Sequence, residues 1–103
     1  MIPRVLVLEP YADLRTEIAA TLQREHYACD AVATAADAAL ELRRHTYAYV
    51  VVDLDSVDST ALVASIDPTS HVILLTNGEQ QQEGYPALRK PFGRAELMAQ
   101  FTS

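Results

Sequence analysis

A chain of 103 residues is long enough for one compact domain with a modest hydrophobic core and too short for two, so we expect residues 1–103 to form a single domain. Fourteen Asp and Glu against eight Lys and Arg give a net charge of -6, which argues against direct binding to nucleic acid, because neutralising phosphates requires a basic surface. Hydrophobic residues make up 50% of the chain, yet the longest apolar runs reach only about five residues, whereas a membrane-spanning helix needs roughly 20; we therefore expect an ordinary soluble domain.

The first predicted elements are a strand, a helix and a second strand. Residues 5–8 form a short, unbroken apolar run, which is the pattern of a strand buried on both faces of a parallel sheet. Leu14, Ile18 and Leu22 follow at intervals of four residues, which predicts an amphipathic helix. Residues 28–32 are interpreted as a second, shorter strand.

The next predicted element is a helix with a capping signal at its start. Thr34 is followed three residues later by Asp37, which resembles a capping box with Asp in place of the usual Glu. Ala36, Ala39 and Leu40 then share one helical face.

Two further strands are predicted on either side of a short helix. Residues 49–52 and 72–75 repeat the unbroken apolar pattern. Residues 59–66 provide about two helical turns before Asp67-Pro68 ends them. This alternation of strands and helices predicts a parallel sheet with right-handed crossovers and helices on both faces.

The remaining segment is short for what it must contain. Residues 77–89 have to provide a crossover and a last strand, although a parallel crossover usually takes a dozen residues or more by itself. Glycines and Pro86 interrupt this segment and leave only residues 79–83 as a plausible helix, so we expect a shortened or missing fourth helix. Residues 87–89 are predicted to form a brief edge strand, and residues 93–101 a short closing helix.

Four polar residues stand where the predicted strands end. Glu9 follows the first strand, Asp53 the third, Thr76 the fourth and Lys90 the fifth. In open parallel sheets, ligands bind outside the carboxyl ends of the strands, so these side chains are expected to face one crevice. Two carboxylates, a hydroxyl and an ammonium group together favour phosphoryl transfer.

These residues and their flanking sequences resemble the receiver domains of two-component response regulators over nearly the whole chain. The resemblance implies a flavodoxin-like, doubly wound, five-stranded parallel sheet with strand order 2-1-3-4-5, in which Asp53 accepts a phosphoryl group from a histidine kinase. It also implies a cis peptide bond between Lys90 and Pro91, which would aim the lysine inward. The matching segments are Val5-Leu6-Val7-Leu8-Glu9, Asp13-Leu14-Arg15, Val50-Val51-Val52-Asp53-Leu54, Ile73-Leu74-Leu75-Thr76 and Lys90-Pro91-Phe92.

The same resemblance assigns a role to each site residue. Glu9, Asp53 and the backbone carbonyl of Asp55 would be the ligands of Mg²⁺, a hard cation that prefers oxygen ligands. Lys90 would balance the charge of the phosphoryl group. Thr76 would donate a hydroxyl hydrogen bond to that group and move toward it on activation.

The sequence departs from the family pattern in two places near the site. Receivers usually end the first strand with two adjacent acidic residues, but Pro10 occupies the second position, so Mg²⁺ binding is expected to be weak. The Asp55 side chain, or less favourably Asp13, would have to compensate for the missing ligand. Ala87 stands where the family commonly has an aromatic residue coupled to the threonine, and Tyr85 is the nearest substitute.

Two functional hypotheses remain, and a third is disfavoured. The first is a working phospho-receiver, which is not a classical enzyme and at most catalyses its own phosphorylation and dephosphorylation. The second is a pseudo-receiver that binds proteins without phosphotransfer. A flavin or nucleotide enzyme on the same fold is disfavoured because residues 9–13 contain no glycine to cradle a phosphate.

The partners expected for either hypothesis are proteins. A receiver implies a histidine kinase or phosphotransfer protein and a downstream protein partner, and it allows a homodimer, with no direct contact to nucleic acid or membrane. A single cysteine, Cys29, and the absence of an opening signal-peptide pattern favour the cytoplasm.

Overall fold

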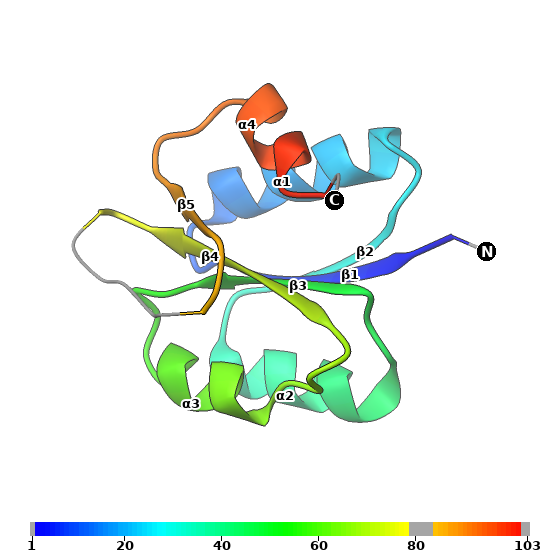
Figure 1. Cartoon of the computed structure of the whole chain (residues 1–103), viewed down its shortest axis with the longest axis vertical. Coiled ribbons are helices and arrows are strands. Elements are labelled where there is room, and N and C mark those ends of the chain that lie inside the picture. The colour runs from blue at the N-terminus through cyan, green and yellow to red at the C-terminus, as the bar shows by residue number, and fades with distance from the viewer. Residues whose placement is uncertain (1, 79–83, 102–103) are drawn as a thin grey trace.

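The structure is a computed structural model that describes residues 2–78 and 84–101. In this part of the chain, five strands form one sheet in the order β2-β1-β3-β4-β5, and all neighbours pair in parallel (Figure 1). The predicted doubly wound α/β architecture is therefore confirmed. The elements in chain order are β1 (Arg4–Leu8), α1 (Ala12–Arg24), β2 (Ala28–Val32), α2 (Ala35–Arg44), β3 (Tyr49–Asp53), α3 (Ser59–Ser65), β4 (His71–Thr76), β5 (Ala87–Arg89) and α4 (Arg94–Ala99).

Helices cover both faces of the sheet, which explains the unbroken apolar runs. Figure 1 shows α1 and α4 on one face and α2 and α3 on the other. Successive side chains of a strand point to opposite faces, so a strand covered on both sides must be apolar at every position. In β1, Val5 and Val7 pack into the layer under α1 and α4, whereas Leu6 and Leu8 pack into the layer under α2 and α3.

The helix α2 begins at the predicted cap. Thr34 precedes the helix in an extended conformation, and its side-chain oxygen accepts a hydrogen bond from the backbone N–H of Asp37 over 3.1 Å. This bond satisfies one of the amides that have no partner inside the helix at its first turn.

The register of the strands aligns their carboxyl ends at one edge of the sheet. Val52 lies opposite both Leu8 and Leu74, and Thr76 lies opposite Arg89. The backbone N–H of Lys90 continues the last pairing by donating to the carbonyl of Thr76 over 2.8 Å. The residues that end or follow β1, β3, β4 and β5 therefore lie at the same edge.

The last strand of the sheet is as short as the sequence predicts. The strand β5 has only three residues, and no helix lies between β4 and β5 in the part of the crossover that the structure describes. The plausible helix at residues 79–83 lies outside the described residues. The closing helix spans Arg94–Ala99, which is shorter than the predicted 93–101.

An aromatic cluster attaches the end of α4 to the sheet. The ring centroid of Phe101 lies 4.7 Å from that of Tyr49 and 5.3 Å from that of Tyr27. The Tyr49 hydroxyl donates a hydrogen bond to the carbonyl oxygen of Phe101 over 3.2 Å. Tyr49 begins β3 and Tyr27 precedes β2, so these contacts hold the short closing helix against the core.

A polar network connects β1, β2 and the segment before β3. The Arg4 Nε donates to Asp30 Oδ2 over 2.9 Å, and the Tyr47 hydroxyl donates to the same oxygen over 2.8 Å. Burial raises the pKa of the Asp30 carboxyl, but the hydrogen bonds from Tyr47 and Arg4 outweigh burial and hold that pKa below its usual value. Asp30 therefore stabilises the fold in its charged form.

We expect a fall in pH to lower the free energy of unfolding of the wild-type protein by more than it lowers that of an Asp30→Asn variant. A carboxyl whose pKa is lower in the folded state contributes stability above its unfolded pKa of about 3.9, and the contribution is lost as the pH falls through the folded pKa. Urea unfolding at pH 6 and pH 3 measures this difference for each protein. The other carboxyl groups are common to both, so equal losses of unfolding free energy would contradict the assignment.

Among the described residues, no helix has both the length and the apolar character needed to cross a membrane.

Candidate functional site

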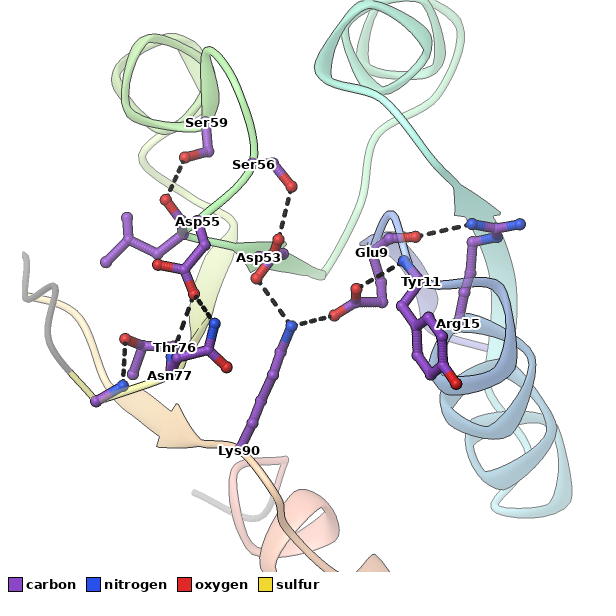
Figure 2. A network of polar contacts seen from close by, with 12 residues as sticks. Glu9, Tyr11, Arg15, Asp53, Asp55, Ser56, Ser59, Thr76, Asn77 and Lys90 are labelled. Atoms are coloured by element: carbon purple, nitrogen blue, oxygen red, sulfur yellow. Dashed lines mark hydrogen bonds and ion pairs between the residues drawn. The ribbon is translucent and has the colours of Figure 1, made fainter.

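The four residues predicted from the strand ends come to one edge of the sheet. Glu9 directly follows β1, Asp53 ends β3, Thr76 ends β4 and Lys90 directly follows β5. Figure 2 shows Lys90 reaching up from the β5 side between the carboxylates of Glu9 and Asp53. The sheet order places β1, β3, β4 and β5 next to one another, which is why residues far apart in sequence meet here.

One ammonium group bridges the two carboxylates. Lys90 Nζ lies 2.6 Å from Glu9 Oε1 and 2.9 Å from Asp53 Oδ1. The exposed fraction of the side chain is 18% for Lys90, 2% for Glu9 and 5% for Asp53. Charges buried this far from water interact strongly, and two carboxylates with one ammonium leave a net charge of about −1 at the site.

The two carboxylates keep Lys90 charged. Burial on its own lowers the pKa of the Lys90 ammonium. Hydrogen bonds to Glu9 and Asp53 and the negative charges of these residues outweigh burial, so the pKa of Lys90 is raised above its usual value. Lys90 is therefore available as a fixed positive charge at neutral pH.

Each carboxylate has a second partner from its own loop. Glu9 Oε2 accepts a hydrogen bond from the backbone N–H of Tyr11 over 3.0 Å, and Asp53 Oδ2 accepts one from the Ser56 hydroxyl over 2.7 Å. The Arg15 guanidinium donates to the backbone carbonyls of Glu9 over 2.9 Å and Pro10 over 3.2 Å. The loop that carries Glu9 is thus held against α1.

The Asp55 side chain lies apart from the ammonium bridge. Its Oδ2 accepts hydrogen bonds from the backbone N–H of Asn77 over 3.2 Å and from the Asn77 side-chain amide over 2.8 Å. These bonds tie the loop after β3 to the loop after β4 (Figure 2). The sequence makes the Asp55 carboxylate a candidate to replace the ligand missing at Pro10. In the structure this carboxylate is hydrogen-bonded to Asn77.

Thr76 and the cis-proline stand where the sequence places them. The Thr76 Oγ1 accepts a hydrogen bond from the backbone N–H of Gly78 over 3.0 Å, so the hydroxyl also closes the turn after β4. Gly78 adopts a φ of 102°, a conformation that favours glycine. The peptide bond between Lys90 and Pro91 is cis, as predicted.

Tyr85 does not lie where an aromatic partner of Thr76 would. It lines a hollow at the beginning of β4, together with His71 and Val72, whereas Thr76 is the last residue of that strand. The strand position expected for an aromatic residue is occupied by Ala87, which lies opposite Leu74.

The donor set of the site fits a Mg²⁺ ion. Mg²⁺ is usually held by one or two carboxylates, water and the phosphate oxygens of a substrate, and Glu9 and Asp53 provide two carboxylates from neighbouring strands. Lys90 competes with a cation for the same oxygens. Among the described residues, the only group of three acidic, histidine or cysteine side chains with ligand atoms within 4.8 Å is Asp30, Glu41 and His45, and Arg4 already forms an ion pair with Asp30 there.

Sequence reasoning misses Ser56 and the pairing of Asp55 with Asn77. Ser56 stands in a polar loop of ordinary composition, and only the turn after β3 brings its hydroxyl back onto Asp53. Its position three residues after Asp53 is the one available signal, because a turn of that length brings a side chain back to the residue at which the turn starts.

Comparisons with known proteins identify the fold. A receiver domain from Methanospirillum hungatei superposes with a TM-score of 0.88 at 18% sequence identity, over 98% of this chain and 91% of that one. A CheY-like receiver domain from Methylobacillus flagellatus superposes with a TM-score of 0.82 at 21% identity, over 96% of this chain and 95% of that one. No protein-family model and no curated protein matches the chain.

A further similar structure contains a metal ion. The receiver domain of a sensor histidine kinase from Pseudomonas aeruginosa, described with a magnesium ion coordinated in its active site cleft, superposes with a TM-score of 0.80 at 24% identity, over 96% of this chain and 93% of that one. At these identities the similarity establishes the fold: the chain has the five-stranded, flavodoxin-like fold of CheY-like receiver domains.

Proposed function

We propose that the chain is a receiver domain of a two-component signalling system in which Asp53 accepts a phosphoryl group. The observation that carries this proposal is the position of Lys90 Nζ, 2.6 Å from Glu9 and 2.9 Å from Asp53 at the carboxyl edge of a receiver-like sheet. A buried carboxylate beside a fixed cation can accept phosphorus without strong repulsion between anions. The domain acts as a signalling module rather than as a classical enzyme.

The transfer itself needs few groups. An oxygen of Asp53 forms a bond to phosphorus, the bond from phosphorus to the donor nitrogen or oxygen breaks, and its electron pair leaves with the donor. Lys90 neutralises charge on the incoming phosphoryl oxygens. Glu9 and Asp53, with the backbone carbonyl of Asp55, would hold Mg²⁺, which supplies further neutralisation of the phosphoryl oxygens when bound.

Thr76 is proposed to report the phosphorylated state. Its Oγ1 accepts from the Gly78 N–H, so a movement of Thr76 toward a phosphoryl group would break that turn bond. The adjacent Asn77 is tied to Asp55 over 2.8 Å, so the loops after β3 and β4 would rearrange together. Such a coupled loop movement is the surface change through which the signal would pass.

The proposed partners are proteins of the same signalling pathway. The phosphoryl group would come from a histidine kinase or a phosphotransfer protein, and a downstream protein or a second copy of the chain would read the altered surface. We place these events in the cytoplasm, without direct contact to nucleic acid or membrane. The net charge of -6 supports the exclusion of nucleic acid.

Incubation with a small phosphodonor and Mg²⁺ is expected to add the mass of one phosphoryl group to the wild-type protein. Asp53→Asn should take no label, because an amide oxygen is too weak a nucleophile. Asp58→Asn is the matched control: it makes the same chemical change in the same loop, and asparagine tolerates the left-handed conformation of φ 64° found there.

Intact-protein mass spectrometry measures the label in all three proteins. Labelling of wild type and Asp58→Asn with none on Asp53→Asn supports the proposal. An unlabelled wild type, or an Asp53→Asn variant labelled to the same extent, contradicts it.

A pseudo-receiver is the second candidate, and specific observations favour it. Pro10 offers no side-chain ligand, and the Lys90 ammonium already forms ion pairs with both Glu9 and Asp53 in this structure. Such a domain would bind its partner without phosphotransfer. In the native organism, full signalling output from Asp53→Asn would favour the pseudo-receiver, and loss of output would favour the phospho-receiver.

A further inference from the structure

Ser56 binds the oxygen of Asp53 that Lys90 does not. Its hydroxyl donates to Asp53 Oδ2 over 2.7 Å, whereas Lys90 Nζ lies 2.9 Å from Oδ1. Figure 2 shows the two contacts approaching the carboxylate from different sides, Ser56 from the loop after β3 and Lys90 from the β5 side. The two oxygens of the acceptor are therefore in different environments.

The loop after β3 holds Ser56 in place. The backbone N–H of Ser56 donates to the carbonyl of Asp53 over 3.2 Å, and the backbone N–H of Ser59 donates to the carbonyl of Ser56 over 3.2 Å. The Ser59 hydroxyl is buried and donates to the carbonyl of Leu54 over 2.8 Å. These bonds keep the Ser56 hydroxyl aimed at the acceptor.

We propose that Ser56 is a positioning residue that favours Asp53 as a free carboxylate and thereby shortens the lifetime of its phosphorylated form. This inference rests on the proposed function of Asp53. Asp53 Oδ1 faces the Lys90 ammonium, which reduces the repulsion between the carboxylate and an incoming phosphoryl group. The phosphoryl group is therefore placed on Oδ1. Oδ2 then remains as the carbonyl oxygen of the acyl phosphate and keeps its bond to Ser56.

The strength of that bond changes during hydrolysis. A water oxygen forms a bond to phosphorus, the bond from phosphorus to Oδ1 breaks, and its electron pair returns to Asp53 as a carboxylate, while the proton of the water passes to solvent. Negative charge then spreads over both carboxylate oxygens. Hydrogen bonds to a charged acceptor are about twice as strong as those to a neutral one, so the Ser56 hydroxyl stabilises the leaving carboxylate.

Ser56 is not placed to take the phosphoryl group itself. In-line displacement requires the attacking oxygen to lie opposite the leaving oxygen across phosphorus. The Ser56 oxygen instead lies beside the leaving carboxylate, at hydrogen-bond distance from Oδ2.

The test compares the lifetimes of the phosphorylated proteins. Wild type, Ser56→Ala and Ser56→Thr are labelled with a small phosphodonor and Mg²⁺, the donor is removed, and the decline of the added mass is followed. We expect Ser56→Ala to keep its label about fivefold longer than wild type. In this variant the Asp53 carboxylate, which is the leaving group, no longer receives the charge-assisted hydrogen bond from the Ser56 hydroxyl. Ser56→Thr retains the hydroxyl and should restore a lifetime close to that of wild type.

Ser65→Ala is the matched control. It also removes a serine hydroxyl that donates a hydrogen bond, in this case to the backbone carbonyl of Leu62 over 2.7 Å, but it lies in α3 away from the site. A lifetime that is the same in Ser56→Ala and wild type, or is not restored by Ser56→Thr, overturns the role of Ser56 and leaves Asp53 as the acceptor. A wild type that takes no label shows instead that the proposed function, and with it this inference, is wrong.

Discussion

Replacing Lys90 with methionine is expected to lower the free energy of unfolding by about 3–5 kcal/mol at neutral pH. Methionine keeps most of the apolar stem but removes the ammonium group that bridges Glu9 and Asp53. The two carboxylates are 2% and 5% exposed, so without Lys90 they would remain buried as neighbouring like charges. A buried charge without a partner is among the most destabilising changes available to a small domain.

Urea unfolding of the variant and of two comparison proteins measures this effect. Arg94→Met removes an ion pair with Glu25 whose side chains are 58% and 37% exposed, so its effect should be small. Adding Asp53→Asn to Lys90→Met removes the repulsion between the Glu9 and Asp53 carboxylates and should recover part of the lost free energy of unfolding. If Lys90→Met and Arg94→Met have the same free energy of unfolding, the ion pairs of Lys90 with Glu9 and Asp53 do not stabilise the fold by the expected amount.

The same variant also reports on the proposed Mg²⁺ site. Lys90 competes with a cation for Glu9 and Asp53, so its removal should allow Mg²⁺ to bind more tightly. Mg²⁺ should therefore raise the melting temperature of Lys90→Met by more than it raises that of wild type. An equal shift in both proteins would argue that Glu9 and Asp53 do not form the cation site.

The second large effect is expected in the core, where Leu74→Ala should cost about 2–5 kcal/mol of unfolding free energy. Leu74 lies in β4 and is completely buried, in the cluster that also contains Leu6 and Val52. Truncation there loses the transfer free energy of the removed atoms and leaves a cavity in a layer closed by α2 and α3.

Leu40→Ala provides the matched control for this prediction. It makes the same chemical change in α2, at a side chain that is 48% exposed, and should have a much smaller effect. Urea unfolding compares the two variants at one temperature. A Leu74→Ala protein that unfolds outright agrees with the prediction, whereas one as stable as Leu40→Ala would contradict the burial of Leu74 in the core.

The strands and the main site residues can be predicted from the sequence because they depend on local patterns. An unbroken apolar run such as residues 5–8 reports burial on both faces of a sheet, and that condition arises mainly in parallel sheets. Once the sheet is parallel, residues that end strands share one edge, and the strand-end positions of Glu9, Asp53 and Lys90 therefore suffice to group them.

The finer contacts cannot be predicted in this way because they depend on loop conformation. The sequence indicates that Lys90 faces the site but not that one ammonium forms ion pairs with both Glu9 and Asp53. The sequence also makes the Asp55 side chain a candidate cation ligand, whereas the turn after β3 directs that side chain to Asn77. Turns bring side chains together through a few backbone torsions that periodicity does not encode.

The most direct test of the central claim is to map the phosphoryl group after labelling with a small phosphodonor and Mg²⁺. The protein is digested, the modified peptide is identified by mass spectrometry, and half of the sample is treated with neutral hydroxylamine, which cleaves acyl phosphates. We predict one modification on the peptide that contains Asp53, removed by hydroxylamine. A phosphoryl group that resists hydroxylamine, as on the Ser56 hydroxyl, or the absence of label from this peptide would contradict the assignment of Asp53 as the acceptor.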